Sequence, residues 1–168
     1  SGQGDSINLL EERAKTYEYR KVIFGGTPTV KGLSRVDEAF ASSDQRMFMV
    51  PCHECGEEHV LSWDNVGGNE DAPGADELLG KSQPDTARYG CPHCGVLWRD
   101  IDKNRNVKKG YWKAHKPFRG VAGFYINELY SPFPGSKLAL LVEKYLKSEH
   151  HLNQGAESNT HGRGHNPP

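Results

Sequence analysis

The amino-acid sequence predicts an α+β fold with a small β-rich centre. Apolar residues recur at helical spacing near both ends of the chain, whereas the middle consists of short strand-like runs broken by Gly and Pro. Two Cys-x-x-Cys pairs lie in this middle part, and they contain all four cysteines of the 168 residues. Because hydrophobic residues make up only 35% of the chain, we expect a thin core that needs support beyond apolar burial.

The first part of the chain is expected to form a helix, a strand and a second, short helix. Apolar residues spaced three and four apart predict an amphipathic helix over residues 6–19. The nearly all-apolar run at 21–25 is typical of a buried strand, and paired glycines with a proline then end it in a loop. Ser34, followed by Asp37 three residues later, resembles a capping box and predicts a short helix through Ala41.

The middle of the chain is expected to place strands on both sides of each cysteine pair. Strand-like residues 45–51 and 58–63 flank the first pair, and 86–90 and 96–98 flank the second. The charged segment 100–109 follows, and we expect it to be a short helix or a loop.

The last part of the chain is expected to contain two more strands and a helix. Residues 111–115 and 121–129 have strand character, and apolar residues between 138 and 145 mark one face of a final helix. Only one leucine occurs in the nineteen residues after Glu149, so we expect a disordered tail. The expected parts of the chain are residues 1–44, 45–99, 100–148 and 149–168.

Each cysteine pair has the features of a metal-binding turn. The sequences Cys-His-Glu-Cys-Gly and Cys-Pro-His-Cys-Gly lie 35 residues apart. Two residues between the thiols let both sulfurs of a tight turn point at one centre, and the following glycine can adopt a positive φ. Four converging thiolates are typical of a closed, structural Zn²⁺ site, so we expect a zinc ribbon. The candidate ligands are Cys52, Cys55, Cys91 and Cys94.

Other interpretations of the cysteines are open. Two disulfides would suit a secreted chain, but no signal peptide precedes them. The spacing also resembles rubredoxin, an iron electron carrier, although the segment between the pairs is open and acidic here. Three histidines lie beside the cysteines; because four thiols already complete a site, we expect them to face solvent. They are His53, His59 and His93.

Charge is balanced overall, with a formal net charge of −1, but it is unevenly distributed. Six acidic residues and one lysine lie between Asp64 and Asp85, which predicts a solvated loop. Seven basic and no acidic residues lie between Lys103 and Arg119, with aromatic residues among them. This stretch is a candidate nucleic-acid surface, or else a polar exterior around a strand with inward-facing aromatics. The candidate contacts are Lys108, Lys109, Lys113, Lys116 and Arg119.

Several function classes are disfavoured by what the sequence lacks. No apolar run approaches the roughly 18–20 residues that span a bilayer, so we expect a soluble, intracellular chain with no membrane partner. No G-x-S-x-G, H-E-x-x-H or Walker A sequence occurs in these residues. The chain by itself therefore presents no recognisable active site.

The order of several segments resembles the middle of the large subunit of lambda-like tailed-phage terminases, the GpA family, over about residues 5–147. The segments are a Gly-Thr-Pro-Thr turn after a strand, a Ser-Asp-Gln-Arg and Val-Pro-Cys entry to the first cysteine pair, and an Ala-Gly-Phe…Leu-Tyr-Ser-Pro-Phe segment after the second. The resemblance implies a fragment of a genome-packaging motor in which an ATPase drives DNA translocation and an endonuclease cuts concatemers. It implies a fold in which the C-terminal edge of an α/β ATPase sheet precedes the zinc ribbon and a helix.

The resemblance also implies roles and partners. Gly26, Thr27 and Thr29 would correspond to the turn that couples ATP hydrolysis to motion, with the threonine hydroxyls sensing nucleotide state. The parent protein would use ATP and Mg²⁺, act on double-stranded DNA in the host cytoplasm, and assemble with the terminase small subunit and the portal. The Walker motifs and nuclease carboxylates have no counterpart in this chain, so these activities are expected of the parent protein. The alternative is a stand-alone zinc-ribbon module that binds nucleic acid.

Overall fold

The computed structural model describes residues 12–27, 35–67 and 84–148, which form a mixture of helices and largely antiparallel sheets. The predicted α+β class is therefore confirmed. The helices are α2 (Arg35–Ser42), α3 (Asp100–Val107) and residues 138–148. The strands are β1 (Arg46–Pro51), β2 (Glu58–His59), β3 (Val66–Gly67), β4 (Arg88–Gly90), β5 (Leu97–Trp98), β6 (Tyr111–Ala114) and β7 (Phe124–Tyr125). Short 3-10 turns cover Trp63–Asn65, Pro84–Thr86, Glu128–Tyr130 and Pro134–Ser136.

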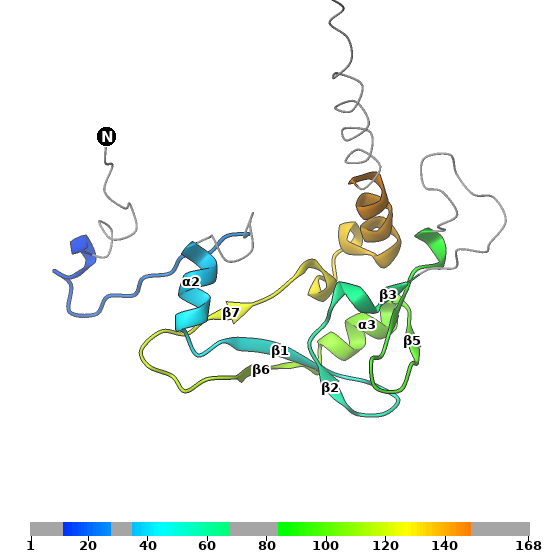
Figure 1. Cartoon of the computed structure of the whole chain (residues 1–168), viewed down its shortest axis with the longest axis horizontal. Coiled ribbons are helices and arrows are strands. Elements are labelled where there is room, and N and C mark those ends of the chain that lie inside the picture. The colour runs from blue at the N-terminus through cyan, green and yellow to red at the C-terminus, as the bar shows by residue number, and fades with distance from the viewer. Residues whose placement is uncertain (1–11, 28–34, 68–83, 149–168) are drawn as a thin grey trace, which may run out of the picture.

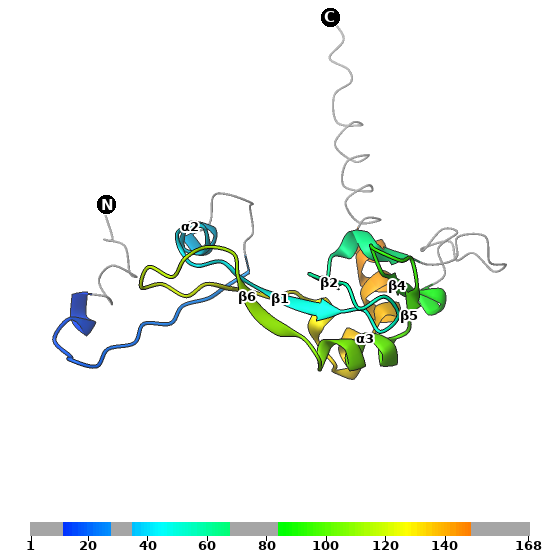
Figure 2. The same cartoon turned by 90° about the horizontal axis from the view of Figure 1, so that it is seen from below.

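Strand β1 pairs with three other strands of the first sheet. Its first four residues pair antiparallel with β6, with Phe48 opposite Trp112, and its start also pairs in parallel with β7. Its end pairs with β2, with Val50 opposite His59. A second antiparallel sheet has the order β3-β4-β5. The β1, β6 and β7 part of the first sheet forms an arm that leads away from the second sheet and carries α2 at its far end (Figures 1 and 2).

The core lies at the C-terminal end of β1, away from α2. It combines the end of β1, one cysteine of each pair, the second sheet, the turn after β7 and the final helix. Its buried apolar members are Val50, Cys52, Leu61, Ala87, Tyr89, Cys91, Trp98, Leu129, Tyr130, Leu138 and Leu141. By contrast, every residue of β6 and β7 is exposed. The arm is therefore a single layer without a core of its own.

The hydroxyl of Tyr130 joins two chain segments within the core. It donates to the carbonyl of Phe48 and accepts from the N–H of Leu61, both at 2.9 Å. Burial raises the pKa of Tyr130 to about 12, so the phenol keeps the proton that it donates. The turn after β7 is thereby fixed to β1 and to the segment that follows β2.

The tip of the arm is held by the buried residue Asp44, between α2 and β1. Its carbonyl accepts from the N–H groups of His115 and Lys116 at 3.1 and 3.0 Å. Its carboxylate accepts from the N–H of Gly123 at 3.1 Å and from the Arg46 guanidinium at 2.8 Å. One side chain and its backbone thus connect the starts of β1 and β7 to the loop after β6.

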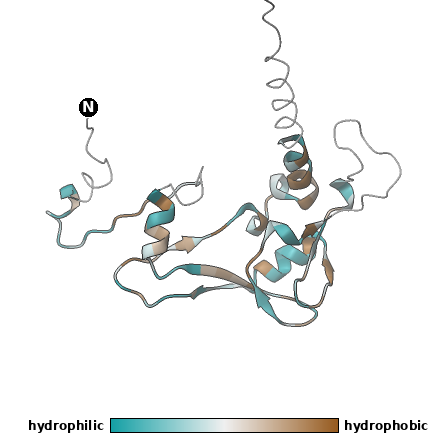
Figure 3. Cartoon of the chain, in the orientation of Figure 1, coloured by the Kyte–Doolittle hydropathy of each residue, from teal (hydrophilic) through white to brown (hydrophobic). Residues whose placement is uncertain are grey.

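The predictions for the first part of the chain are only partly met. The helix predicted over 6–19 begins outside the described residues, and its helical part ends at Ala14. The buried strand predicted at 21–25 is wrong, because this segment has no regular structure and Ile23 is 84% exposed. A strand that is apolar on both faces needs neighbours at both edges and cover on both sides, and no strand among the described residues pairs with it. Figure 3 shows its apolar colour on the segment that precedes α2.

Predictions for the rest of the chain are closer to the structure. The helices α2, α3 and 138–148, and strands β1, β4, β5 and β6, lie where the pattern placed them. The strands predicted at 58–63 and 121–129 are only two residues long, because only Glu58–His59 and Phe124–Tyr125 have ladder partners on β1. Residues 68–83 of the acidic loop and the tail 149–168 lie outside the described residues. Among the described residues, no helix combines the length and apolar character needed to cross a membrane.

Candidate metal centre

Each Cys-x-x-Cys pair closes a tight turn, and the two turns have the same backbone bonds. In the first turn the N–H of Gly56 donates to Cys52 O at 3.0 Å, and the N–H of Cys52 donates to Glu57 O at 3.0 Å. The corresponding bonds of the second turn measure 2.9 and 3.0 Å. Gly56 and Gly95 have φ values of +77° and +75°, which residues with a Cβ rarely adopt. The positive φ predicted for the glycine after each pair is confirmed.

The four sulfurs come together between the two turns. All four Sγ atoms lie within 4.8 Å of one another. Sulfurs from different turns form the close pairs, Cys52 with Cys94 and Cys55 with Cys91, each at 3.8 Å. A tetrahedral ion with metal–sulfur bonds of about 2.3 Å has sulfur–sulfur edges of about 3.8 Å. A disulfide bond is only about 2.05 Å long, so these cysteines are free thiols.

The centre has a buried side and an exposed side. Cys52 and Cys91, the first cysteine of each turn, are each 3% exposed and belong to the core, whereas Cys55 and Cys94 are exposed. An ion held by the four sulfurs would therefore be enclosed by the core on one side. Among the described residues, this is the one group of three or more His, Cys, Asp and Glu side chains close enough to share an ion.

The thiols differ in how readily they ionise. Burial raises the pKa of the Cys52 thiol, but the N–H groups of Cys55 and Glu54 donate to its sulfur and bring the pKa down to about 6. The N–H of Glu57 acts in the same direction on Cys55, yet desolvation and the neighbouring sulfurs raise the pKa of that thiol to about 12. Burial also raises the pKa of Cys91. One thiolate forms easily and further negative charge is opposed, so the donor set suits a divalent cation that compensates the charge.

The histidines near the cysteines do not join the sulfur cluster. His53 and His93 are exposed, as expected, but the prediction that all three face solvent is wrong for His59. The His59 ring is 7% exposed and stacks on Tyr89 with centroids 5.8 Å apart. Burial lowers the pKa of His59, which favours the neutral imidazole. Its role is packing beside the second turn.

Helix α3 lies against the first cysteine turn and contains two buried polar residues, Lys103 and Asn106. The Lys103 ammonium donates to Leu129 O at 2.8 Å and to Ser131 O at 3.0 Å. Burial lowers the pKa of this ammonium. Lys103 opens the basic stretch of the sequence, and its burial removes it from any phosphate-binding surface.

The five candidate nucleic-acid contacts are all exposed and come from three successive parts of the chain. Lys108 and Lys109 follow α3, Lys113 lies in β6, and the last two, Lys116 and Arg119, lie in the loop beyond β6. The Lys116 ammonium donates to the Ala41 carbonyl at the end of α2, at 3.1 Å. The alternative of inward-facing aromatics is wrong, because the aromatic residues of this stretch are exposed.

The turn that the resemblance assigned to coupling is only partly described. Gly26 and Thr27 are exposed and have no regular structure, and Thr29 lies outside the described residues. A Cβ added to Gly26 would lie 3.4 Å from the Val36 side chain, so this turn approaches α2.

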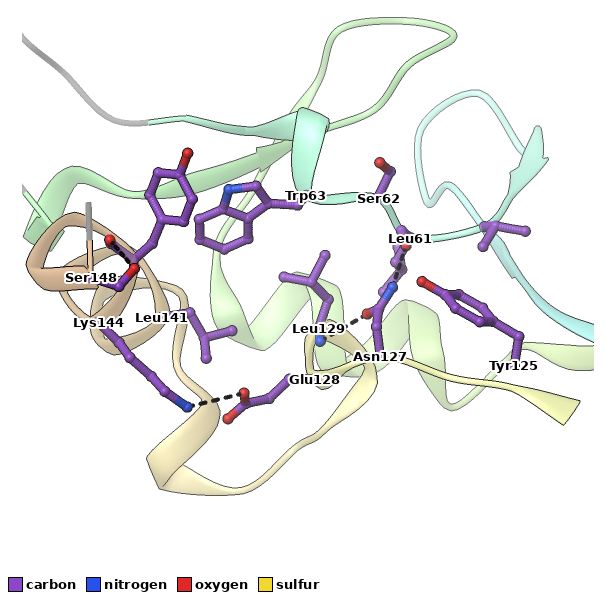
Figure 4. Close-up of a pocket in the computed structure, with 12 residues that line it drawn as sticks. Leu61, Ser62, Trp63, Tyr125, Asn127, Glu128, Leu129, Leu141, Lys144 and Ser148 are labelled. Carbon is purple, nitrogen blue, oxygen red and sulfur yellow. Dashed lines mark hydrogen bonds and ion pairs between the residues drawn. The ribbon is translucent and has the colours of Figure 1, made fainter. Parts of the chain in front are cut away.

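A cavity of about 670 Å³, which the sequence did not predict, lies beside the final helix (Figure 4). Leu61, Trp63 and Leu141 of helix 138–148 line it. Tyr145 of the same helix also lines it, with its ring centroid 5.3 Å from that of Trp63. Figure 4 also shows an ion pair between Lys144 and Glu128, whose charged atoms are 3.7 Å apart.

Comparison with known proteins shows the family of this chain. Residues 1–112 match the family described as phage terminase large subunit gpA, ATPase domain. The chain belongs to the gpA family of phage terminase large subunits. It is 32% identical over 150 residues to a protein named "Terminase, large subunit" from Enterobacteria phage P21. That alignment covers 78% of this gpA-family chain and 22% of the P21 protein, so the chain spans about a fifth of the relative's length.

No solved structure matches this gpA-family chain. The family match ends within β6, so both cysteine turns and α3 lie inside the matched residues. The cavity lies mostly beyond them.

Proposed function

We propose that this gpA-family chain supplies a structural zinc ribbon to a viral DNA-packaging motor. The observation that carries the proposal is the convergence of four free thiols, with 3.8 Å between sulfurs of opposite turns. Cys52, Cys55, Cys91 and Cys94 would hold one Zn²⁺. A site closed by four thiolates has no position for a water molecule, so the ion would supply folding free energy rather than catalysis.

Support for a stabilising role comes from the composition of the core. The buried apolar set is small, and two of its members are the cysteines themselves. Binding of a structural zinc ion contributes on the order of 10 kcal/mol or more to folding. The ribbon, which lies inside the residues matched to the ATPase domain, would thereby become a rigid connection toward a nuclease region of the parent protein.

The activity of the whole motor belongs to the parent protein in this proposal. The parent protein would hydrolyse ATP with Mg²⁺, translocate double-stranded DNA and cut concatemers, together with a terminase small subunit and a portal in the host cytoplasm. The family match to an ATPase domain supports the first of these activities. Gly26, Thr27 and Thr29 would form the coupling turn, with both hydroxyls responding to the bound nucleotide.

Metal content tests the zinc assignment. Native mass spectrometry of the purified chain is expected to find one zinc per polypeptide, and Cys52→Ser is expected to lower this occupancy. His93→Ala is the matched control, because His93 lies in the second turn but outside the sulfur cluster, and it should keep the ion. A compact, metal-free chain whose four thiols are all open to alkylation would refute the proposal. A coloured, iron-loaded chain would favour the rubredoxin-like alternative.

A second candidate function is nucleic-acid binding by this chain alone. The observation that favours it is the exposure of all five candidate basic residues in a stretch that has no acidic residue. Each phosphate contact adds about −0.9 to the slope of log K against log salt concentration. Replacing both Lys108 and Lys109 by Ala should therefore weaken binding to duplex DNA and make the salt dependence shallower by about two contacts. The charge-matched control replaces Lys137 and Lys147 by Ala. Undetectable binding of the unsubstituted chain to duplex DNA at low salt would refute this function.

A further inference from the structure

The first cysteine turn is in contact with a buried amide from another element. Asn106 of α3 is 1% exposed, and its Nδ2 lies 2.9 Å from Nδ1 of His53. The amide nitrogen donates, so His53 Nδ1 accepts and the ring carries its proton on Nε2. Because His53 directly follows Cys52, this bond fixes the loop between the two sulfurs of the turn.

Helix α3 is itself firmly held, so Asn106 is a fixed point. Lys103, one turn earlier in the helix, is anchored to the carbonyls of Leu129 and Ser131. At the start of the helix, the Asp100 carboxylate accepts from the N–H of Leu138 at 3.0 Å. The helix is thereby bonded at two points to the segment between Leu129 and Leu138.

The core packs around the Cys52 side chain but not around the Cys55 side chain. Cys52 is buried, whereas Cys55 is exposed, so packing alone does not set the direction of the Cys55 side chain. The contact between His53 and Asn106 holds one of the two residues that separate these sulfurs. In this arrangement the Cys55 sulfur lies 3.8 Å from the Cys91 sulfur.

We propose that Asn106 is a positioning residue for the metal centre, which holds the first cysteine turn through His53 so that Cys55 is aimed at the shared ion. This inference rests on the zinc site proposed above. Outer contacts that orient metal-binding groups are typically worth about 10–100-fold in metal affinity. The bond should therefore affect metal affinity and release more than it affects the fold without metal.

The test compares two asparagines of the same helix. Asn106→Leu removes the amide at nearly constant volume, and Asn104→Leu is the matched control, because Asn104 Oδ1 is buried with no partner among the described residues. Competition with a chelator measures the Zn²⁺ affinity of each full-length chain. We expect the Zn²⁺ affinity of Asn106→Leu to be at least about tenfold lower than that of the unsubstituted chain. The affinity of the control should stay within about twofold of the unsubstituted chain.

A double-mutant cycle separates positioning from general destabilisation. His53→Ala should lower the affinity by a similar factor, and adding Asn106→Leu to it should have little further effect. In the Co²⁺-loaded chain, the sulfur-to-metal charge-transfer bands should weaken in Asn106→Leu and remain unchanged in Asn104→Leu.

The outcomes distinguish this inference from the zinc proposal. If the unsubstituted chain binds no metal, the zinc proposal is refuted, and the positioning role is refuted with it. If the unsubstituted chain binds one ion and Asn106→Leu binds it equally well, only the positioning role is overturned. Equal losses of affinity in the Asn106 and Asn104 variants would overturn it as well, because a generally weakened helix would then explain the result.

Discussion

Single polar side chains determine how the segments of this protein meet. Tyr130, Asp44 and Asn106 are buried, and each bonds to a segment that is distant in the sequence. A buried donor or acceptor without a partner costs about 1–3 kcal/mol. In a chain with so few apolar core residues, the loss of one such bond is a large part of the total stability.

Tyr130 provides the most direct test of this view. Tyr130→Phe leaves Phe48 O and Leu61 N without their shared partner inside the core, so the free energy of unfolding should fall by about 1–3 kcal/mol. Chemical denaturation followed by tryptophan fluorescence measures the change. Tyr145→Phe is the control, since Tyr145 is 45% exposed, and it should change the value by less than about 0.5 kcal/mol. Equal effects of the two substitutions would contradict the role given to the Tyr130 hydroxyl.

Asp44 should make the stability of the arm depend on pH. Burial raises the pKa of the Asp44 carboxyl, but the bonds from Arg46 and Gly123 outweigh it and hold the pKa below its usual value. A lowered folded-state pKa stabilises the fold above the unfolded value of about 3.9, and this contribution is lost as the pH falls through the folded-state pKa. The difference in unfolding free energy between the unsubstituted chain and Asp44→Asn should therefore shrink when the pH falls from about 6 to below about 4. A difference that stays constant over this range would show that the charge of Asp44 does not matter.

At the residue level, the sequence predicts what depends on local geometry and fails where burial decides. The glycine after each cysteine pair follows from the turn itself, and the structure confirms it. The sequence pattern groups Lys103 with exposed basic residues, because nothing in its neighbours reveals that it lies in the core. The pattern gives no signal for Asn106 either, since an Asn in a charged, mostly polar segment is typical of a solvent-facing position.

At the level of elements, helix α3 and strand β1 organise the protein. Strand β1 has ladder partners on both sides, and α3 connects the first cysteine turn to the turn after β7 and to the final helix. The strands around the cysteines could be predicted, because each tight turn brings its own flanking residues together. The segment 21–25 could not be placed, because its predicted burial depends on strands absent from the described residues.

The connection between α3 and β6 should not tolerate a side chain. A Cβ at Gly110 would overlap with Phe48 Cε1 and lie 2.6 Å from Met49 O, and the backbone atom cannot move aside easily. Gly110→Ala should therefore push β6 away from β1 and lower the free energy of unfolding by about 1–3 kcal/mol. Gly135→Ala is the control, since a Cβ there meets nothing within 4 Å. Thermal unfolding of both variants measures the effect, and similar melting temperatures would contradict it.

At the level of the whole molecule, the ribbon and the segment after it share one core. Cys52 and Cys91 lie in the same buried cluster as Leu129, Leu138 and Leu141. Composition and spacing cannot show which distant segments pack together, so this contact could not be predicted from the sequence. The division near residue 99 stays a prediction, and the shared core leads us to expect that the cysteine turns and the final helix lose stability together.

Metal removal should therefore reduce protection from hydrogen exchange beyond the cysteine turns as well. Hydrogen exchange after chelation is expected to rise in residues 46–67 and 84–98, and also in residues 129–141. Helix α2 should change little, because none of its residues is buried. Adding Zn²⁺ back should restore protection in all three regions. If residues 129–141 stayed protected without metal, the shared core would not depend on the ion.

The geometry of β1 has a mechanical consequence for the role proposed above. Strand β1 is six residues long, about 20 Å, has no glycine, and leads directly into Cys52. In the proposed role of the chain, a pull at the start of β1 would reach the first cysteine turn along one strand that has ladder partners on both sides.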